Sequence, residues 1–96
     1  MDIRYSLRAR QEEIDLLEYI LENFGKAKAK EVYEKIESIL HLISEMPNMY
    51  RPSNKQKGLR KCVLSKQTSM YYRIQGNCIE IVSFRPNRIN PKAFKI

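Results

Sequence analysis

The chain has 96 residues, of which 43% are hydrophobic, and a formal net charge of +7 at pH 7. This length suits one domain, residues 1–96, with a single modest core. No stretch approaches the roughly 18 consecutive apolar residues of a membrane span, and the first residues lack the apolar run of a secretory signal, so we expect a cytoplasmic protein.

The charges are divided unevenly between the two halves. Residues 1–50 hold seven Lys/Arg against ten Asp/Glu, a net −3, whereas residues 51–96 hold eleven Lys/Arg against Glu80 alone, a net +10. A one-sided basic surface attracts phosphate backbones or an acidic protein and speeds encounter with either. The alternative is that the charge serves solubility alone, although solubilising surfaces normally mix both signs.

The first half predicts a short strand followed by two helices. Residues 1–5 alternate apolar and polar side chains, and Ser6 can cap a helix that Gly25 ends. Acidic residues crowd its early turns, where the helix dipole favours them, and apolar residues recur near helical spacing. The acidic residues are Glu12, Glu13 and Asp15, and the apolar stripe comprises Ala9, Ile14, Leu17, Ile20, Leu21 and Phe24.

A second helix is predicted over residues 29–46, where apolar residues keep a three-and-four spacing until Pro47. Tyr33 and Met46 lie on this stripe and are expected in the core rather than as cofactor contacts. The short connection makes the helices antiparallel neighbours whose joint apolar face needs a sheet to cover it.

The second half predicts a three-stranded antiparallel meander. Residues 47–58 form a basic loop rich in Pro, Asn and Gly, in which Tyr50 could stack on a base or close the core. Residues 59–65, 69–75 and 78–84 are rich in β-branched and aromatic residues and are joined by turn-forming segments. Side chains alternate between the two faces of a strand. In the first of these strands Arg60, Cys62 and Leu64 share one face. In the second, Tyr71, Arg73 and Gln75 share one face, and in the third, Ile79, Ile81 and Ser83 do. The remaining residues, 85–96, are predicted to form an extended basic tail.

The sequence carries little material for catalysis. Two cysteines, Cys62 and Cys78, are too few for a disulfide framework, and with His41 they have no zinc-ligand spacing, so we expect no metal. No nucleotide-binding glycine loop or serine triad pattern is present, and we expect no cofactor. His41 is expected to be a surface or packing residue, because it is distant in sequence from every basic cluster.

What remains is cationic and aromatic. Arginine can hold phosphate bidentately and can stabilise charge that develops on phosphorus during RNA cleavage, although the same groups can also only bind. Each also has the simpler interpretation of a solvated surface residue. The candidate target-binding or nucleic-acid-binding residues are Lys57, Arg60, Lys61, Arg73, Arg85 and Arg88.

The order and spacing of several short motifs resemble the RelE/ParE family of type II toxin–antitoxin toxins, also known as plasmid stabilisation proteins. The likeness spans nearly the whole chain. The motifs are Ser6 with Ala9, Asp15-Leu16, Tyr19-Ile20, the Pro47 loop, Gly58-Leu59-Arg60, Tyr72-Arg73-Ile74, Ile79-Glu80-Ile81 and Arg88-Ile89-Asn90-Pro91.

This resemblance implies an α+β fold, in which a two-helix N-terminal hairpin packs on a small antiparallel sheet made of the first strand and the meander. It also implies a growth-inhibiting toxin that an acidic antitoxin neutralises by wrapping it, in an oligomer with that antitoxin. An acidic segment that orders on a +10 surface gains electrostatic attraction, which agrees with the charge division. Which residues bind the antitoxin is not predicted.

The family divides in activity. RelE-like members cleave mRNA on the ribosome with basic residues, here Arg60, Arg73 and Arg88, and usually a C-terminal tyrosine or histidine. Neither type follows Arg88, and Phe94, near that position, cannot transfer a proton. We therefore favour the ParE-like activity, inhibition of DNA gyrase without catalysis. The alternatives are the ribosome-dependent endoribonuclease and an inactive basic adaptor that only binds its antitoxin.

Overall fold

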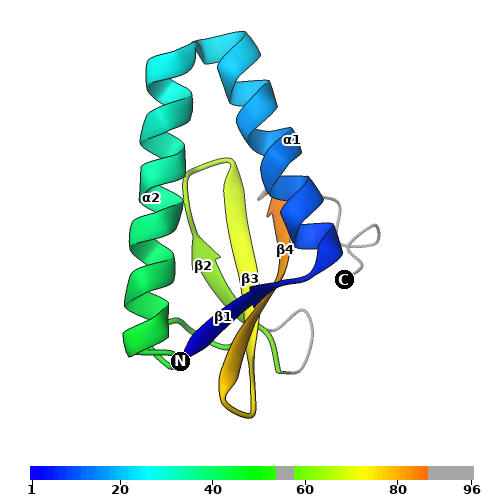
Figure 1. The fold of residues 1–96 in the computed structure, drawn as a ribbon, viewed down its shortest axis with the longest axis vertical. Helices are drawn as coiled ribbons and strands as arrows, with labels where there is room; N and C mark the ends of the chain where they lie inside the picture. The colour runs from blue at the N-terminus through cyan, green and yellow to red at the C-terminus, as the bar shows by residue number, and fades with distance from the viewer. Residues whose placement is uncertain (54–57, 87–96) are drawn as a thin grey trace.

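The computed structural model describes residues 1–53 and 58–86. Two helices form a hairpin that packs against a four-stranded sheet (Figure 1). The predicted α+β architecture is confirmed, whereas the expectations for Lys57, Arg88 and the tail from residue 87 onward fall outside the described residues. The elements are β1 (Asp2–Tyr5), α1 (Leu7–Phe24), α2 (Lys26–Glu45), β2 (Arg60–Val63), β3 (Thr68–Gln75) and β4 (Cys78–Pro86).

The helix boundaries follow from two residues that the sequence singled out. The Ser6 hydroxyl accepts a hydrogen bond from the Ala9 backbone N–H at 2.9 Å and so caps α1. Gly25 joins the helices with φ 91° and ψ 172°, a backbone conformation that side chains other than glycine's rarely adopt. One residue therefore turns the chain from α1 into α2.

The sheet has the strand order β1-β4-β3-β2, and β2, β3 and β4 form the predicted antiparallel meander. β1 pairs with β4 in parallel, so the complete sheet is mixed rather than wholly antiparallel. The parallel direction follows from topology, because α2 returns the chain to the start of β1, where the Met1 amino group donates to the Ser44 carbonyl at 2.9 Å. The two turns of the meander then give β4 the direction of β2. The strand β4 also continues to Pro86, two residues beyond the predicted end.

An irregularity in β3 and β4 changes one predicted face. The register shifts between Tyr71 and Tyr72, so that Ile81 lies opposite Tyr72 while Ser83 lies opposite Tyr71. Successive residues of β3 point to opposite faces, and Ser83 therefore does not share a face with Ile81 as regular alternation predicted.

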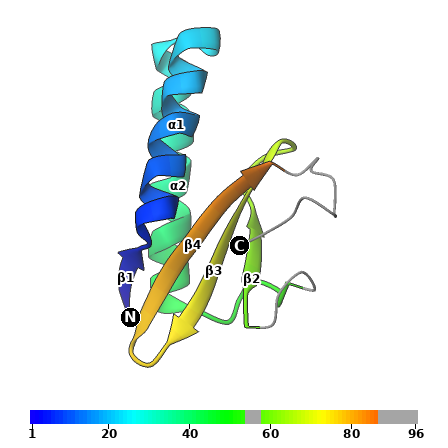
Figure 2. The ribbon, with the colours of Figure 1, turned by 90° about the vertical axis from the view of Figure 1, so that its right-hand side faces the viewer.

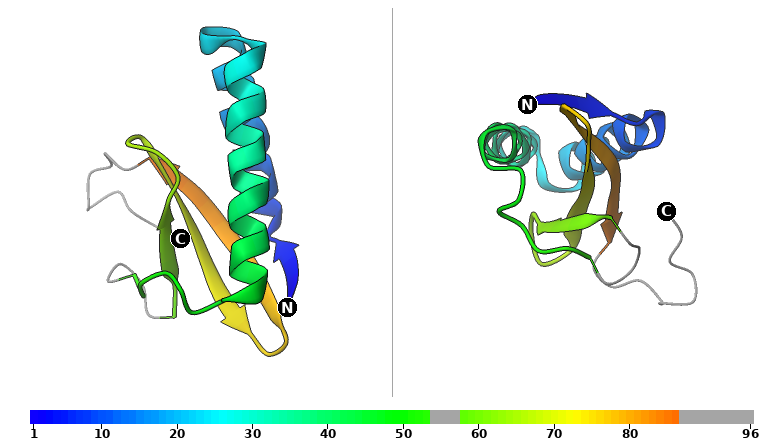
Figure 3. Two further views of the ribbon diagram at one scale, coloured as in Figure 1. Left: turned by 90° about the vertical axis from the view of Figure 1, so that its left-hand side faces the viewer. Right: turned by 90° about the horizontal axis from the view of Figure 1, so that it is seen from below.

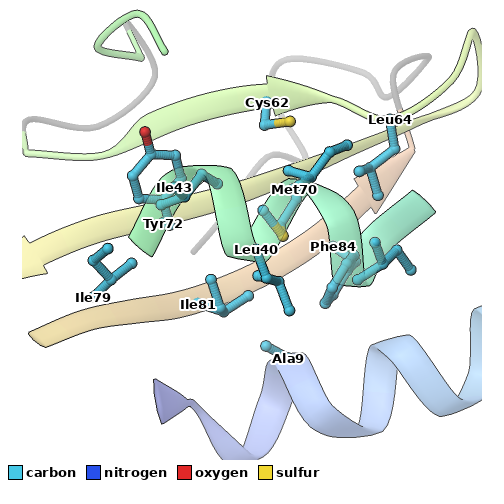
Figure 4. Close-up of a cluster of buried hydrophobic side chains, with 12 residues drawn as sticks. Ala9, Leu40, Ile43, Cys62, Leu64, Met70, Tyr72, Ile79, Ile81 and Phe84 are labelled. Carbon is cyan, nitrogen blue, oxygen red and sulfur yellow. The ribbon is translucent and has the colours of Figure 1, made fainter. Parts of the chain in front are cut away.

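The hydrophobic core fills the space between the hairpin and the sheet (Figure 4). Figure 4 shows Ala9 of α1 and Leu40 of α2 directed towards side chains of the strands. The core comprises Ala9, Ile36, Ile39, Leu40, Ile43, Cys62, Leu64, Met70, Tyr72, Ile79, Ile81 and Phe84.

Several apolar residues predicted for the core lie instead on the surface. Tyr33 and Met46 are 47% and 51% exposed, and Ile14, Leu21 and Phe24 are also exposed. Phe24 is exposed because the hairpin and the sheet diverge towards the closed end of the hairpin (Figure 2), whereas Ile14, Leu21 and Tyr33 line a surface made by the helices alone. Met46 is the C-cap residue at the opposite end of α2. Within the described residues, no helix is long and apolar enough to cross a membrane.

Acidic residues of α1 fasten the helix to the sheet. The first turn of α1 contains none, which corrects the expectation that the helix dipole places them. Instead, the Glu12 carboxylate accepts hydrogen bonds from the Ser83 hydroxyl at 2.8 Å and the Phe84 backbone N–H at 3.1 Å. The Ser6 hydroxyl also donates to the Val82 carbonyl at 2.9 Å. Side chains of Ser6 and Glu12 thus provide hydrogen-bond partners for the backbone of β4 beyond the end of β1, where no strand pairs with it on that side.

Candidate functional site

The face of the sheet opposite the core carries four cations. Side chains alternate along a strand, so the neighbours of core residues point to this face. The strand register sets Arg4 beside Glu80 and Arg73, Lys61 beside Tyr71, and Arg85 beside Ser69. Arg4, Lys61, Arg73 and Arg85 are named the basic face below.

The cations of the basic face differ in their surroundings. The Arg73 Nε donates to the Glu80 carboxylate at 2.7 Å, which offsets part of its charge. The pKa of Tyr71 is raised, because burial of the phenol outweighs the effect of the nearby Arg85 guanidinium. Arg4 and Lys61 have no ion-pair partner among residues 1–53 and 58–86 and are therefore the cations best placed to meet an external anion.

Three of the predicted binding residues thus meet on one face, and a fourth does not. Lys61, Arg73 and Arg85 share the basic face, whereas Arg60 lies opposite Tyr72 on the core side. Arg4 was missed in the sequence, because its proximity to Arg73 depends on the pairing of β1 with β4. That pairing joins residues far apart in the chain and leaves no local signal.

Arg60 has a structural role. Its Nη1 donates to the Tyr50 carbonyl at 2.7 Å and so ties β2 to the loop after α2. Tyr72 reinforces the same loop, because its hydroxyl donates to the Pro47 carbonyl at 2.8 Å and its ring meets that of Tyr50 edge-on, with centroids 6.4 Å apart. Of its two predicted alternatives, Tyr50 therefore packs against the core.

Tyr50 also contacts Cys62. A hydrogen bond to Cys62, together with partial burial, raises the pKa of Tyr50 to about 12. Burial raises the pKa of the Cys62 thiol, which therefore stays neutral near pH 7 and packs in the core as the sequence suggested. This cluster stabilises the sheet and offers no nucleophile.

Tyr71 and Glu80 are the groups on the described basic face that could transfer a proton besides its cations, and the Glu80 carboxylate accepts a hydrogen bond from Arg73 Nε at 2.7 Å. Tyr71 borders the face but is 3% exposed. His41 lies on exposed α2, where its Nε2 is 2.6 Å from Glu45 Oε1, in agreement with the prediction of a surface histidine. The described residues contain no group of three His, Cys, Asp or Glu side chains that could hold a metal ion.

An apolar groove opens where the hairpin and the sheet diverge. It has a volume of about 450 Å³ and lies between the upper turns of both helices and the turn after β2. Tyr19 and Phe24 are 59% and 64% exposed at its wall, with ring centroids 6.2 Å apart. The residues that line the groove include Leu16, Tyr19, Ile20, Phe24, Val32, Ile36 and Leu64, with Lys28, Glu31 and Lys35 beside them. The sequence held one sign of this groove. The apolar stripe of α1 is wider than a helix needs when only one of its faces packs against the core.

Sequence comparison places the chain in a family. The family model described as ParE toxin of type II toxin-antitoxin system, parDE, matches residues 3–91. The chain belongs to the ParE toxin family. No protein of curated function matches this ParE family member in sequence.

Solved structures share the fold. A chain of the chromosomal ParDE toxin–antitoxin system from P. aeruginosa superimposes with a TM-score of 0.77 at 20% identity, covering 90% of this chain and 95% of that one. The YoeB/ParE toxin from Agrobacterium tumefaciens gives 0.66 at 16% identity, covering 91% and 99%. A chain of the E. coli DinJ-YafQ complex gives 0.62 at 14% identity, covering 88% and 91%. At these identities the likeness establishes the ParE/YoeB-like fold alone.

Proposed function

We propose that this ParE family member is the toxin of a type II toxin–antitoxin pair, that it inhibits DNA gyrase, and that an acidic antitoxin neutralises it. The observation that carries the proposal is the ParE family match over residues 3–91. Inhibition by binding requires no bond chemistry, which agrees with a described basic face on which Tyr71 is buried and the Glu80 carboxylate is paired with Arg73.

The basic face is the proposed target-binding surface. Arg4 and Lys61 project from the two edge strands of the sheet, β1 and β2, where their charges can meet an acidic protein surface or a DNA backbone. Because a sheet holds such side chains in fixed register, little conformational entropy of the backbone is lost on binding. Arg85 and Arg73 extend the same face.

The apolar groove is the proposed antitoxin site. An amphipathic segment could place apolar side chains against Tyr19 and Phe24 and acidic side chains beside Lys28. The solved relatives from P. aeruginosa and from E. coli come from toxin–antitoxin assemblies, which supports such a partner here. Antitoxin in the groove would also bring its acidic chain close to the +10 half of the sequence.

Ribosome-dependent mRNA cleavage is the second candidate, and the observation that favours it is the basic face, which suits a phosphate backbone. Its proposed catalytic set was Arg60, Arg73 and Arg88. Arg60 and Arg73 lie on opposite faces of the sheet, and the Arg60 guanidinium is engaged by the Tyr50 carbonyl. These two residues therefore do not act on one substrate atom in this arrangement.

Controlled expression without the antitoxin tests the proposal in cells. We expect loss of viability with induction of a DNA-damage reporter before protein synthesis falls. Immediate arrest of translation with new transcript ends would favour the endoribonuclease instead. Unchanged growth at a protein level confirmed by immunoblotting would identify an inactive basic adaptor.

A further inference from the structure

The hairpin carries a second apolar surface on the side away from the groove. Residues that line this shallow depression come only from the two helices, and the sheet contributes none among those described. Leu16 and Ile20 line the groove, whereas Ile14, two residues from Leu16 and so about 200° around α1, lines the second surface. The outer strip is defined as Ile14, Leu17, Leu21, Ala29 and Tyr33.

Three apolar side chains of the outer strip are exposed to solvent. Ile14, Leu21 and Tyr33 are each more than 40% exposed. The three residues line the same depression. The hairpin that carries them stands clear of the sheet in its upper part (Figure 3). Contiguous apolar patches with a polar rim mark interaction sites in soluble proteins.

Opposite charges flank the two sides of the outer strip. Glu18 of α1 lies on one side, and Lys26 and Lys30 of α2 lie on the other. In the described chain none of these three side chains has an ion-pair partner. Glu18 and Lys30 lie at similar distances from Gly25 along the hairpin axis, because the antiparallel helices are joined at Gly25, and the two residues are seven positions before it and five positions after it.

We propose that the outer strip is the docking surface for a second copy of this chain. In a two-fold contact whose axis runs along the hairpin, α1 of each copy faces α2 of the other. The operation brings the acidic side of one strip onto the basic side of the other. Glu18 of one copy then meets Lys30 of its partner, twice, around a centre of Leu17, Leu21 and Tyr33.

Self-complementarity is what selects a second copy over other occupants. A uniformly acidic partner would pair with Lys26 and Lys30 but would meet repulsion from Glu18. The dimer also leaves the groove and the basic face open, because the outer strip lies on the opposite side of the hairpin. Two toxins in one assembly would then engage antitoxin or target with increased avidity.

Sedimentation analysis of the purified full chain over a range of concentrations tests the proposal. We expect a reversible monomer–dimer equilibrium. Lys30→Glu and Glu18→Lys should each raise the dimer dissociation constant by about tenfold or more, since each substitution places like charges at both symmetric contacts. The double variant Glu18→Lys/Lys30→Glu restores opposite charges and should recover the original constant.

Tyr19→Ser in the groove is the control and should leave dimerisation unchanged, while circular dichroism checks that every variant is folded. A chain that stays monomeric at all concentrations would overturn the proposal. The proposal would also be overturned by a dimer whose dissociation constant is the same in the single and double charge variants. A dimer that Tyr19→Ser abolishes would overturn it as well. A monomer whose Tyr33 becomes protected from chemical labelling only with antitoxin would assign the strip to the antitoxin instead.

Discussion

Glu13 shows how much one buried side chain contributes to the junction of β1 and α1. It is 4% exposed, and its carboxylate accepts hydrogen bonds from the Tyr5 hydroxyl at 2.8 Å and from Arg10 Nη1 at 3.1 Å. The Arg10 guanidinium lies 3.7 Å from the centre of the Tyr5 ring. The three side chains thus satisfy one another at an otherwise apolar boundary.

Glu13→Ala removes the acceptor and leaves a partly buried hydroxyl without its partner. We expect the free energy of unfolding to fall by about 1–3 kcal/mol. Glu34→Ala, on the exposed surface of α2, is the control and should change it by less than about 0.5 kcal/mol. Urea unfolding measures both, and equal effects would show that the Glu13 contacts contribute nothing specific.

Tyr50 predicts a sensitivity to alkaline pH. Its pKa is raised from 10.0 to about 12, so the folded state retains a proton that the unfolded state has lost between these values. This contribution to stability is complete below pH 10 and is lost as the pH rises towards 12. Tyr50→Phe should therefore show a shallower fall in the free energy of unfolding above pH 10. An unchanged slope in pH-dependent unfolding would contradict this assignment.

At single positions, the sequence predicted which residues share a face of a strand better than it predicted what each residue does. Alternation correctly grouped Arg60 with Cys62 and Leu64, but it could not show that this face is the covered one. Arg60 therefore became a binding candidate although its guanidinium holds a loop. The face of Ser83 was mispredicted because the irregularity between β3 and β4 has no sequence signature.

At the scale of elements, Ser6 links α1 to β4 as well as capping the helix. Ser6→Ala removes both the acceptor for Ala9 and the donor to Val82. We expect a loss of about 1–2 kcal/mol in the free energy of unfolding, the usual cost of an N-cap. Ser6→Thr keeps the hydroxyl and should recover most of it in thermal unfolding, whereas equal losses in the two variants would argue against the hydroxyl.

A substitution in the groove should weaken binding of the antitoxin without lowering the stability of the fold. Phe24 is 64% exposed, so Phe24→Ala should change the free energy of unfolding by less than about 0.5 kcal/mol. Affinity for the antitoxin should nevertheless fall by about tenfold or more, since buried aromatic anchors dominate interfaces. Calorimetric titration measures this affinity. Leu7→Ala, 93% exposed at the start of the same helix, should bind normally, and parallel losses in the two variants would move the site away from the groove.

Local signals predicted the elements well because caps and breakers act within a few residues. Ser6, Gly25 and Pro47 mark helix ends that the structure confirms. The parallel pairing of β1 with β4 and the divergence of the hairpin from the sheet depend on packing between distant segments. Consequently the outer strip and the position of Arg4 became visible only in three dimensions, and the groove had only the width of the α1 apolar stripe as a sign in the sequence.

At the scale of the whole molecule, the charge division becomes a division between layers. The two helices hold six Lys/Arg against nine Asp/Glu, a net −3, and the four strands hold five Lys/Arg against Asp2 and Glu80, a net +3. The sheet therefore carries the net positive charge, while the hairpin offers apolar surfaces. In the account proposed above, target binding is thereby separated from binding of antitoxin and of a second copy.

Supercoiling by gyrase from the source organism, with the purified protein added, tests the central claim most directly. We expect inhibition by the unaltered protein and by Lys28→Ala, a matched loss of one charge on the hairpin. Inhibition should weaken by about tenfold or more in the folded double variant Arg4→Ala/Lys61→Ala, since both cations belong to the proposed contact surface. Arg88→Ala tests the further basic residue that the family resemblance indicated. Full supercoiling in the presence of folded, unaltered protein would contradict the account and favour the ribosome as the target.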